Sequence, residues 1–399
     1  MRICHLLSHD RIKSGGAIQA LLLARAQRRR GHEVRLVFNA GREPDEARRA
    51  FAPLAEEGFD CHAVPMQHLA RFGGRRRLRR LVDEFTPDVL HAHRERALRF
   101  ALDALAGRDR PALIAQKGNC YRSDARTAAA FRSPRLDRIV AVAGAVKKVL
   151  VLHDGVPPEK VEVVYGSFDP ARFSERCDPG EARRALGLPT GVPLVGLLAN
   201  LDRKKGHRLF FEAAARVARV REDARFVAIG GGDVERARAE AAAAGAGEAV
   251  TFAGFRPDAE VALSALDVSV NCSKDGEGLT GAIRESMALG VPVVCTNVAG
   301  NSEIVENGVT GLLVPPADPG RLAAAIVAAL ADPEGAARRA EEGRRRVRAT
   351  MDDDVRADRI LALYEEVLRW RRPTLAERGI EGCLHPDVAT FEAPGPADG

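Results

Sequence analysis

Residues 2–39 read RICHLLSHDRIKSGGAIQALLLARAQRRRGHEVRLVFN. An apolar run at residues 2–7 precedes the glycine turn at Gly15 and Gly16, and apolar side chains then recur at helical spacing until Gly31. A second apolar run follows at residues 33–39. This order of strand, glycine turn, helix and strand predicts a βαβ unit, whose two strands lie parallel in one sheet.

The same alternation continues along the chain. Residues 165–181 interrupt it without a clear period, which indicates an interdomain linker. The fold class is therefore predicted to be α/β, with two doubly wound Rossmann-like domains facing a cleft, where ligands of such sheets bind. Further strands are expected at residues 88–92, 113–116, 138–142, 194–198, 226–229, 250–252, 268–271 and 291–296, with helices such as 78–85 and 209–220 between them.

The domain boundaries follow from this pattern. We place an N-terminal domain at residues 1–168 and a C-terminal domain at residues 169–355. Residues 356–373 are expected to form a C-terminal helix that packs back on the N-terminal domain, because apolar side chains recur at helical spacing there. Residues 374–399 are rich in Pro, Gly, Glu and Ala and are predicted to be a disordered tail.

Composition narrows the class of protein. The 399 residues are 46% hydrophobic and 29% charged, which is typical of globular domains. The seven cysteines are odd in number and form no C-x-x-C, so free thiols in a reducing compartment are expected. Residues 1–7 do not have the pattern of a signal peptide, and no apolar run reaches the length of a membrane span, so a cytoplasmic location is predicted.

The net charge of +6 is unevenly distributed. Arginines are concentrated at residues 28–30 and 75–80. Such a run is usually the solvated face of a helix, and the alternative is contact with an anionic partner. The basic segment at residues 71–80 also contains the apolar residues Phe72 and Leu78, which favour a peripheral contact with an anionic membrane as that alternative.

The stretch at residues 271–290, NCSKDGEGLTGAIRESMALG, carries the clearest chemistry. Glu277 and Glu285 stand eight residues apart, with Gly278 and Gly281 between them. Glycines let backbone N–H groups approach an anion, and the start of the predicted helix adds the positive end of its dipole. Carboxylates suit vicinal hydroxyls, because they accept two hydrogen bonds. The combination predicts a nucleotide-sugar site.

The E-x7-E pair belongs to a longer ordered block. The block continues through MALGVPVV at 287–294, Gly300, EIV at 303–305, Gly308 and TGLLV at 310–314. In this block, and in weaker matches such as DVLHAH at 88–93, the sequence resembles the retaining glycosyltransferases of family 4, which have the GT-B fold. The resemblance covers about residues 1–372.

The resemblance implies roles for individual residues. Glu285 would bind the donor ribose, and Glu277 would face the donor sugar and phosphates together with Gly278, Leu279, Thr280 and Gly281. Lys205 would neutralise the leaving diphosphate, and the loop at Gly15 and Gly16 would close on it. The catalytic candidates are therefore Glu277 and Lys205, and the remaining residues are donor-binding candidates.

Two departures from the family pattern stand out. Asn200 occupies the position where many members have an arginine, so Arg203 or the adjacent Lys204 is the nearby candidate to supply that charge. Lys117 stands near the position of a histidine that many members have. Lys117, Asn119 and His93 are the acceptor-side candidates, although His91 and His93, which alternate on one strand, are equally compatible with a structural pair.

The function implied by the resemblance is transfer of a sugar from a nucleotide-diphosphate sugar to a hydroxyl acceptor, with retention of configuration. The acceptor would be a glycan or a lipid-linked molecule, for example in cell-envelope polysaccharide synthesis. No metal, cofactor or nucleic acid is expected, and the run at Asp352–Asp354 is interpreted as a helix cap.

Three alternatives remain open. A GT-B-like sugar-nucleotide epimerase shares the fold, and a catalytically silent nucleotide-sugar-binding protein would bind the donor without turnover. The glycines at 276, 278 and 281 also form G-x-G-x-x-G, a dinucleotide fingerprint. A dehydrogenase is disfavoured, because no acidic residue ends the following strand, where Thr296 and Asn297 stand.

Overall fold

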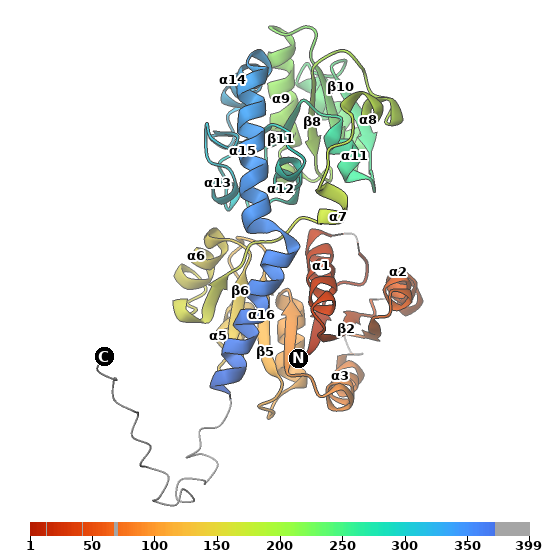
Figure 1. The fold of residues 1–399 in the computed structure, drawn as a ribbon, viewed down its shortest axis with the longest axis vertical. Helices are drawn as coiled ribbons and strands as arrows, with labels where there is room; N and C mark the ends of the chain where they lie inside the picture. Colours follow the sequence, from red (N-terminus) through yellow and green to blue (C-terminus); the bar gives the residue numbers. More distant parts are fainter. Residues whose placement is uncertain (13, 42, 68–70, 372–399) are drawn as a thin grey trace, which may run out of the picture.

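The computed structural model describes residues 1–371 except 13, 42 and 68–70, so the predicted tail at 374–399 lies outside the described residues. The chain forms two lobes, each a parallel sheet with helices on its faces (Figure 1). Every strand pair in both sheets is parallel. The predicted α/β fold with two doubly wound sheets is confirmed.

The N-terminal sheet has seven strands in the order β3-β2-β1-β4-β5-β6-β7. Its strands are β1 (Arg2–Leu7), β2 (Glu33–Asn39), β3 (Asp60–Val64), β4 (Val89–His93), β5 (Ala112–Lys117), β6 (Arg138–Ala141) and β7 (Val161–Val163). Its helices are α1 (Gly15–Arg29), α2 (Pro44–Glu56), α3 (Arg71–Phe85), α4 (Glu95–Ala104), α5 (Ala125–Arg132) and α6 (Gly144–Leu152), followed by the 3-10 turn η1 (Pro158–Lys160). β4 and β5 are buried along their whole length, because helices cover both faces of the sheet.

The C-terminal sheet has six strands in the order β10-β9-β8-β11-β12-β13. Its strands are β8 (Leu194–Leu198), β9 (Arg225–Ile229), β10 (Val250–Gly254), β11 (Val268–Asn271), β12 (Val293–Thr296) and β13 (Leu312–Val314). Around them lie α8 (Pro179–Ala185), η2 (Arg203–Lys205), α9 (His207–Ala218), α10 (Val234–Ala243), α11 (Ala259–Ser264), α12 (Gly281–Ala288), α13 (Asn301–Ile304), α14 (Pro319–Ala331) and α15 (Pro333–Met351).

The predicted linker is more ordered than expected. It contains α7 (Pro170–Phe173) and the start of α8, because Asp169 and Asp178 each accept a hydrogen bond from a backbone N–H and cap these short helices. Proline at the first helical position of both is compatible with helix geometry. The aperiodic sequence therefore hid two capped turns.

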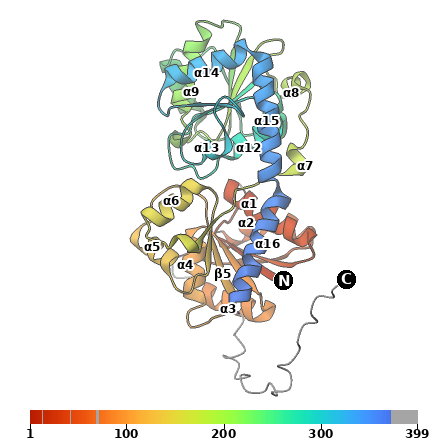
Figure 2. The same ribbon diagram turned by 60° about the vertical axis from the view of Figure 1, so that its left-hand side comes forward.

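The last helix joins the two lobes. Figure 2 shows α15 along the C-terminal lobe and α16 (Asp353–Trp370) along the N-terminal lobe. Asp352 accepts a hydrogen bond from Asp354 N at 2.9 Å, which confirms the predicted cap and starts α16 three residues before the predicted segment. α16 packs Ile360 and Tyr364 into one core cluster with Ile3 and Val89 of the N-terminal sheet.

Candidate active site

The carboxyl ends of the central strands in both sheets meet between the lobes. The loop after β5 pairs with the loop after β11, through a bridge between Asn119 and Glu277 and a hydrogen bond from Cys120 N to Gly276 O at 3.4 Å. The C-terminal sheet reverses its strand order between β8 and β11, so the loop after β11 lies where parallel sheets bind ligands. The N-terminal sheet reverses between β1 and β4, and β5 is the neighbour of β4. The resulting interface is the candidate active site.

Glu277 is held at the end of this loop by a cation and a hydroxyl. Its carboxylate forms an ion pair with Lys205, and its Oε1 accepts a hydrogen bond from Ser273 Oγ at 3.3 Å. Lys205 is the last residue of η2. Asp202 caps the start of this 3-10 turn, where its side chain accepts a hydrogen bond from Lys204 N at 3.1 Å. The structure thus brings together the two predicted catalytic candidates, which are 72 residues apart in sequence.

Glu285 lies in the second turn of α12. Burial raises the pKa of its carboxyl, and the neighbouring Arg284 opposes this shift. Thr280 stands at the N-cap of α12, but its side chain accepts no hydrogen bond from the helix and instead donates to Asn301 Oδ1 at 2.8 Å. The first backbone N–H groups of α12 therefore have no side-chain cap and can receive an anion.

The predicted donor loop packs tightly across the interface. A Cβ at Gly278 would lie 2.4 Å from Gly118 O, so a larger residue there would push the lobes apart. Leu279 packs against core clusters of both lobes. Gly281, by contrast, begins α12 beside the side chains of Arg284 and Glu285. Glycine at 278 is required by the close approach of the two domains.

Gly15 and Gly16 start α1, where Ser14 accepts a hydrogen bond from Ala17 N at 3.3 Å. A Cβ at Gly16 would lie 3.4 Å from side-chain atoms of His9 and Arg94, whereas nothing lies within 4 Å of a Cβ at Gly15. Among the described residues, no hydrogen bond joins either glycine to the loop at 276–281. Arg203 is exposed in η2. The roles of these three residues toward the donor stay predictions.

The acceptor-side candidates have different environments. Lys117 is 1% exposed at the end of β5, where its Nζ lies 3.7 Å from Glu95 Oε1 and 3.2 Å from Ser123 Oγ. Asn119 donates to Glu95 Oε1 at 3.3 Å. A cation, a carboxylate and an amide therefore lie together on the N-terminal side of the interface, directly before the bridge to Glu277.

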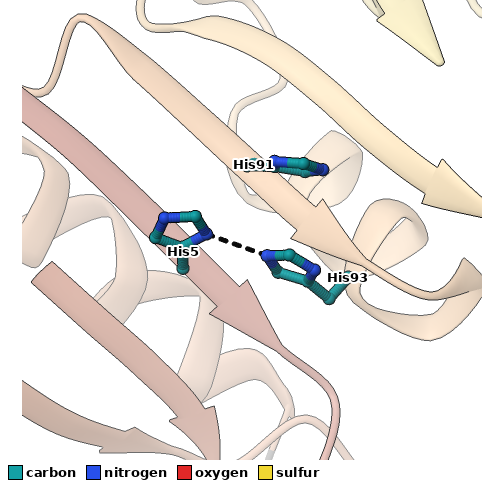
Figure 3. A group of neighbouring side chains, drawn as sticks. All are labelled: His5, His91 and His93. Carbon is teal, nitrogen blue, oxygen red and sulfur yellow. Dashed lines mark hydrogen bonds between the residues drawn. The ribbon is translucent and has the colours of Figure 1, made fainter. Parts of the chain in front are cut away.

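His93 is buried away from this group. Figure 3 shows His93 beside His5 and His91, with His5 Nδ1 and His93 Nε2 2.8 Å apart. His91 in turn is hydrogen-bonded to Tyr364 at 2.6 Å. All three histidines are at most 1% exposed, so His93 belongs to a packed cluster under α16.

Ring nitrogens of the three histidines lie within 4.8 Å of one another, a spacing at which they could hold a metal ion. The ring planes are tilted by only 21–31° relative to each other. Three of the ring nitrogens are already hydrogen-bonded within the protein, His5 Nδ1 to His93 Nε2 and His91 Nδ1 to Tyr364. The group at Asp352–Asp354 serves instead as a cap and as partner of Arg29 and Arg30.

Two contacts in the interface were not foreseen from the sequence. Tyr121 lies over Gly276, where an added Cβ would lie 2.0 Å from the tyrosine oxygen, and Lys204 Nζ lies 4.8 Å from the centre of the Tyr121 ring. Glu303 accepts hydrogen bonds from Gly144 N and Ala145 N across the lobes. Both contacts join segments that are distant in the sequence, so local patterns do not predict them. The aromatic side chain of Tyr121, two residues after Asn119, is the one feature of the sequence that could have suggested a contact there.

Two facing parallel sheets, with Glu277 in the loop before α12, Glu285 within α12 and Lys205 in the nearby η2, form the GT-B arrangement. Two family models match the chain: "Glycosyltransferase Family 4" at residues 13–172 and "Glycosyl transferases group 1" at residues 192–332. The chain belongs to glycosyltransferase family 4. None of the helices in the described part of the chain combines the length and apolarity of a membrane span.

Individual relatives agree with this membership. A 2-deoxystreptamine glucosyltransferase of Streptomyces kanamyceticus is 32% identical over 55% of this chain and 58% of its own length. A D-inositol 3-phosphate glycosyltransferase of Acidothermus cellulolyticus is 34% identical over 61% of this chain and 56% of its own. The match therefore spans little more than half the length of these relatives. HepE of Anabaena, solved with UDP-glucose, has the same fold, with a TM-score of 0.79 and 19% identity over 92% of this chain and all of that one.

Proposed function

We propose that this chain transfers a sugar from a nucleotide-diphosphate sugar to a hydroxyl of a glycan or lipid-linked acceptor, with retention of anomeric configuration. The observation that carries the proposal is the ion pair of Lys205 with Glu277 at the domain interface, in the loop that leads into α12, whose second turn holds Glu285. The fold neighbour HepE was solved with UDP-glucose, so a UDP-sugar is the first donor to test.

The proposed chemistry divides the work between these groups. Lys205 and the uncapped N-terminus of α12 stabilise the negative charge that develops on the leaving diphosphate. Glu285 holds the ribose hydroxyls, and Glu277 orients the donor sugar. The acceptor hydroxyl attacks on the face from which the diphosphate departs, and a phosphate oxygen takes its proton. No protein nucleophile and no metal is assigned a step.

A binding panel tests the donor class first. Thermal unfolding is measured with UDP, GDP, ADP, CMP and NAD, since a ligand at 100 times its Kd stabilises the folded state by about 2.7 kcal/mol. We expect one nucleoside diphosphate to raise the melting temperature. Stabilisation by NAD alone would contradict the proposal.

Substitution of Glu285 tests the site. Glu285→Gln keeps the shape of the side chain but donates where the carboxylate accepts, so we expect donor binding to weaken by about 10- to 100-fold. Glu306→Gln is the matched control, because Glu306 is exposed on the same domain. Wild-type transfer by Glu285→Gln would show that the donor ribose is bound elsewhere. Release of an epimerised sugar without an acceptor would favour an epimerase.

Peripheral binding of this protein to an anionic membrane, where a lipid-linked acceptor would lie, is a separate part of the proposal. In α3, Arg76, Arg77 and Arg80 are exposed, although Arg80 also pairs with Glu84 at 3.4 Å, and Arg75 is half-buried and paired with Asp103. We expect flotation with vesicles that contain anionic lipid, and its loss at high salt, since surface attraction is screened. Replacing the three exposed arginines by Gln should abolish flotation. Equal flotation of the variant would exclude this face.

A further inference from the structure

Arg284 is a buried cation that the proposed chemistry has not used. It lies in α12 directly before Glu285, and it is 4% exposed. Its Nε is buried without a hydrogen-bond partner among the described residues. A guanidinium stays charged in proteins, and burying it with unpaired donors is costly. An anion bound beside Arg284 would balance its charge and accept hydrogen bonds from its unpaired donors.

The guanidinium points to a defined place between three segments. A Cβ built on Gly281, the first residue of α12, would lie 3.7 Å from Arg284 Nη2. A Cβ built on Gly166 in the linker would lie 3.2 Å from Arg284 Nη1 and 2.8 Å from Gln19 Oε1 of α1. Because both residues are glycines, neither places a side chain against the two terminal nitrogens of the guanidinium.

The surroundings of Arg284 carry an excess of positive charge. Arg356 of α16 is also buried, and its charge and that of Arg284 repel each other. Arg356 donates to Gln19 O and Gln116 Oε1, which are neutral acceptors. Glu285 is the carboxylate that acts on Arg284, but the proposed function commits it to the ribose. An anion is therefore favoured beside Arg284.

We propose that Arg284 binds the diphosphate of the nucleotide donor at the N-terminus of α12, an inference that rests on the proposed function. The uncapped N–H groups of α12 and the guanidinium approach the position next to Gly281 together. A guanidinium fork matches two phosphate oxygens in one plane, which a lysine does not. Lys205 and Arg284 then hold the diphosphate from the two ends of the loop that begins at Glu277.

Calorimetric titration with UDP and with uridine tests this inference, or GDP and guanosine if the panel selects GDP. For Arg284→Met we expect affinity for the diphosphate to fall about 10- to 100-fold, while affinity for the nucleoside stays within about twofold. Arg216→Met, the same change at an exposed position of α9, should alter neither. An unchanged diphosphate-to-nucleoside ratio in Arg284→Met overturns the inference and leaves the proposed function intact.

Arg284→Lys keeps the test decisive if the methionine variant does not fold. Burial lowers the pKa of a lysine, so its ammonium should deprotonate as the pH rises from roughly 6 to 9. We expect the ratio of UDP affinity to uridine affinity to fall over this pH range in the variant. The same ratio in the wild type is the reference, because the protonation state of the nucleotide itself also changes with pH. A parallel course in both proteins contradicts the inference. Wild-type protein that binds no nucleoside diphosphate overturns the proposed function, and the inference with it.

Discussion

At the scale of the residue, one glycine sets the backbone that presents Lys205. Gly206 has a φ of +73°, and a Cβ there would lie 1.8 Å from Cys272 O. The left-handed conformation costs an L side chain about 1–2 kcal/mol, and the clash must displace either η2 or the end of β11. We expect Gly206→Ala to separate Lys205 from Glu277 and to lower kcat/KM on the order of 100-fold, measured by steady-state transfer kinetics.

Gly187→Ala is the matched control for this prediction. Gly187 has a φ of +64°, but no atom lies within 4 Å of the position of an added Cβ. This variant should lose about 1–2 kcal/mol of unfolding free energy and keep its activity. Equal activities of Gly206→Ala and Gly187→Ala would mean that the loop position of Lys205 does not limit transfer.

At the scale of the element, α16 covers a cluster of neutral histidines on the N-terminal sheet. Burial lowers the pKa of His5 to about 4, and it holds the pKa values of His91 and His93 well below their ordinary range. His5 is hydrogen-bonded to Gln27 of α1 at 2.7 Å, and His91 to Tyr364 of α16. A proton added to this cluster would also be repelled by Arg356.

The stability of the fold should therefore depend on pH. Between about pH 6.5 and pH 4 the unfolded histidines bind protons that the folded ones do not, so the free energy of unfolding falls as pH falls. His5 alone contributes a loss of about 2 kcal/mol between pH 7.5 and pH 5, measured by urea unfolding. His5→Gln should reduce this difference, and the exposed control His153→Gln should not. A pH dependence identical in wild type and His5→Gln would refute the assignment.

At the scale of the whole molecule, a carboxylate of one lobe caps a helix of the other. Ala143, at the N-cap of α6, has no side chain that can accept a hydrogen bond. The carboxylate of Glu303 in α13 supplies the acceptors, because it accepts hydrogen bonds from Gly144 N at 2.7 Å and from Ala145 N at 2.8 Å. A negative charge at a helix N-terminus is worth about 0.3–1 kcal/mol, and more where it is partly buried. This contact favours the arrangement of the lobes in this structure, in which the two domains touch.

We expect Glu303→Gln to shift the protein toward an open arrangement. The radius of gyration from small-angle X-ray scattering should increase, and the ratio of sugar transfer to donor hydrolysis should fall, because closure excludes water. Glu306→Gln, which removes an exposed ion pair with Arg346, is the control. Unchanged scattering and an unchanged ratio would show that other contacts hold the lobes.

The buried strands β1 and β2 could be predicted from the sequence, whereas three strands at sheet edges could not. The predicted strands at 2–7 and 33–39 match β1 and β2, because buried parallel strands are continuous apolar runs. No strand was predicted at β3, β7 or β13, which lie at sheet edges and are short or only partly buried. Half-buried edge strands lack the strong pattern that central strands have.

The alternation of strands and helices, the family, and the loop and helix that hold Glu277 and Glu285 could be inferred from the sequence, because each depends on residues close together in the chain. Which groups meet follows from the three-dimensional fold: Lys205 with Glu277, Asn119 with Glu277, and Glu303 with α6. It also placed His93 in the core and left Arg284 beside the start of α12. Contacts between domains depend on the docking of two surfaces, and local periodicity carries no information about that docking.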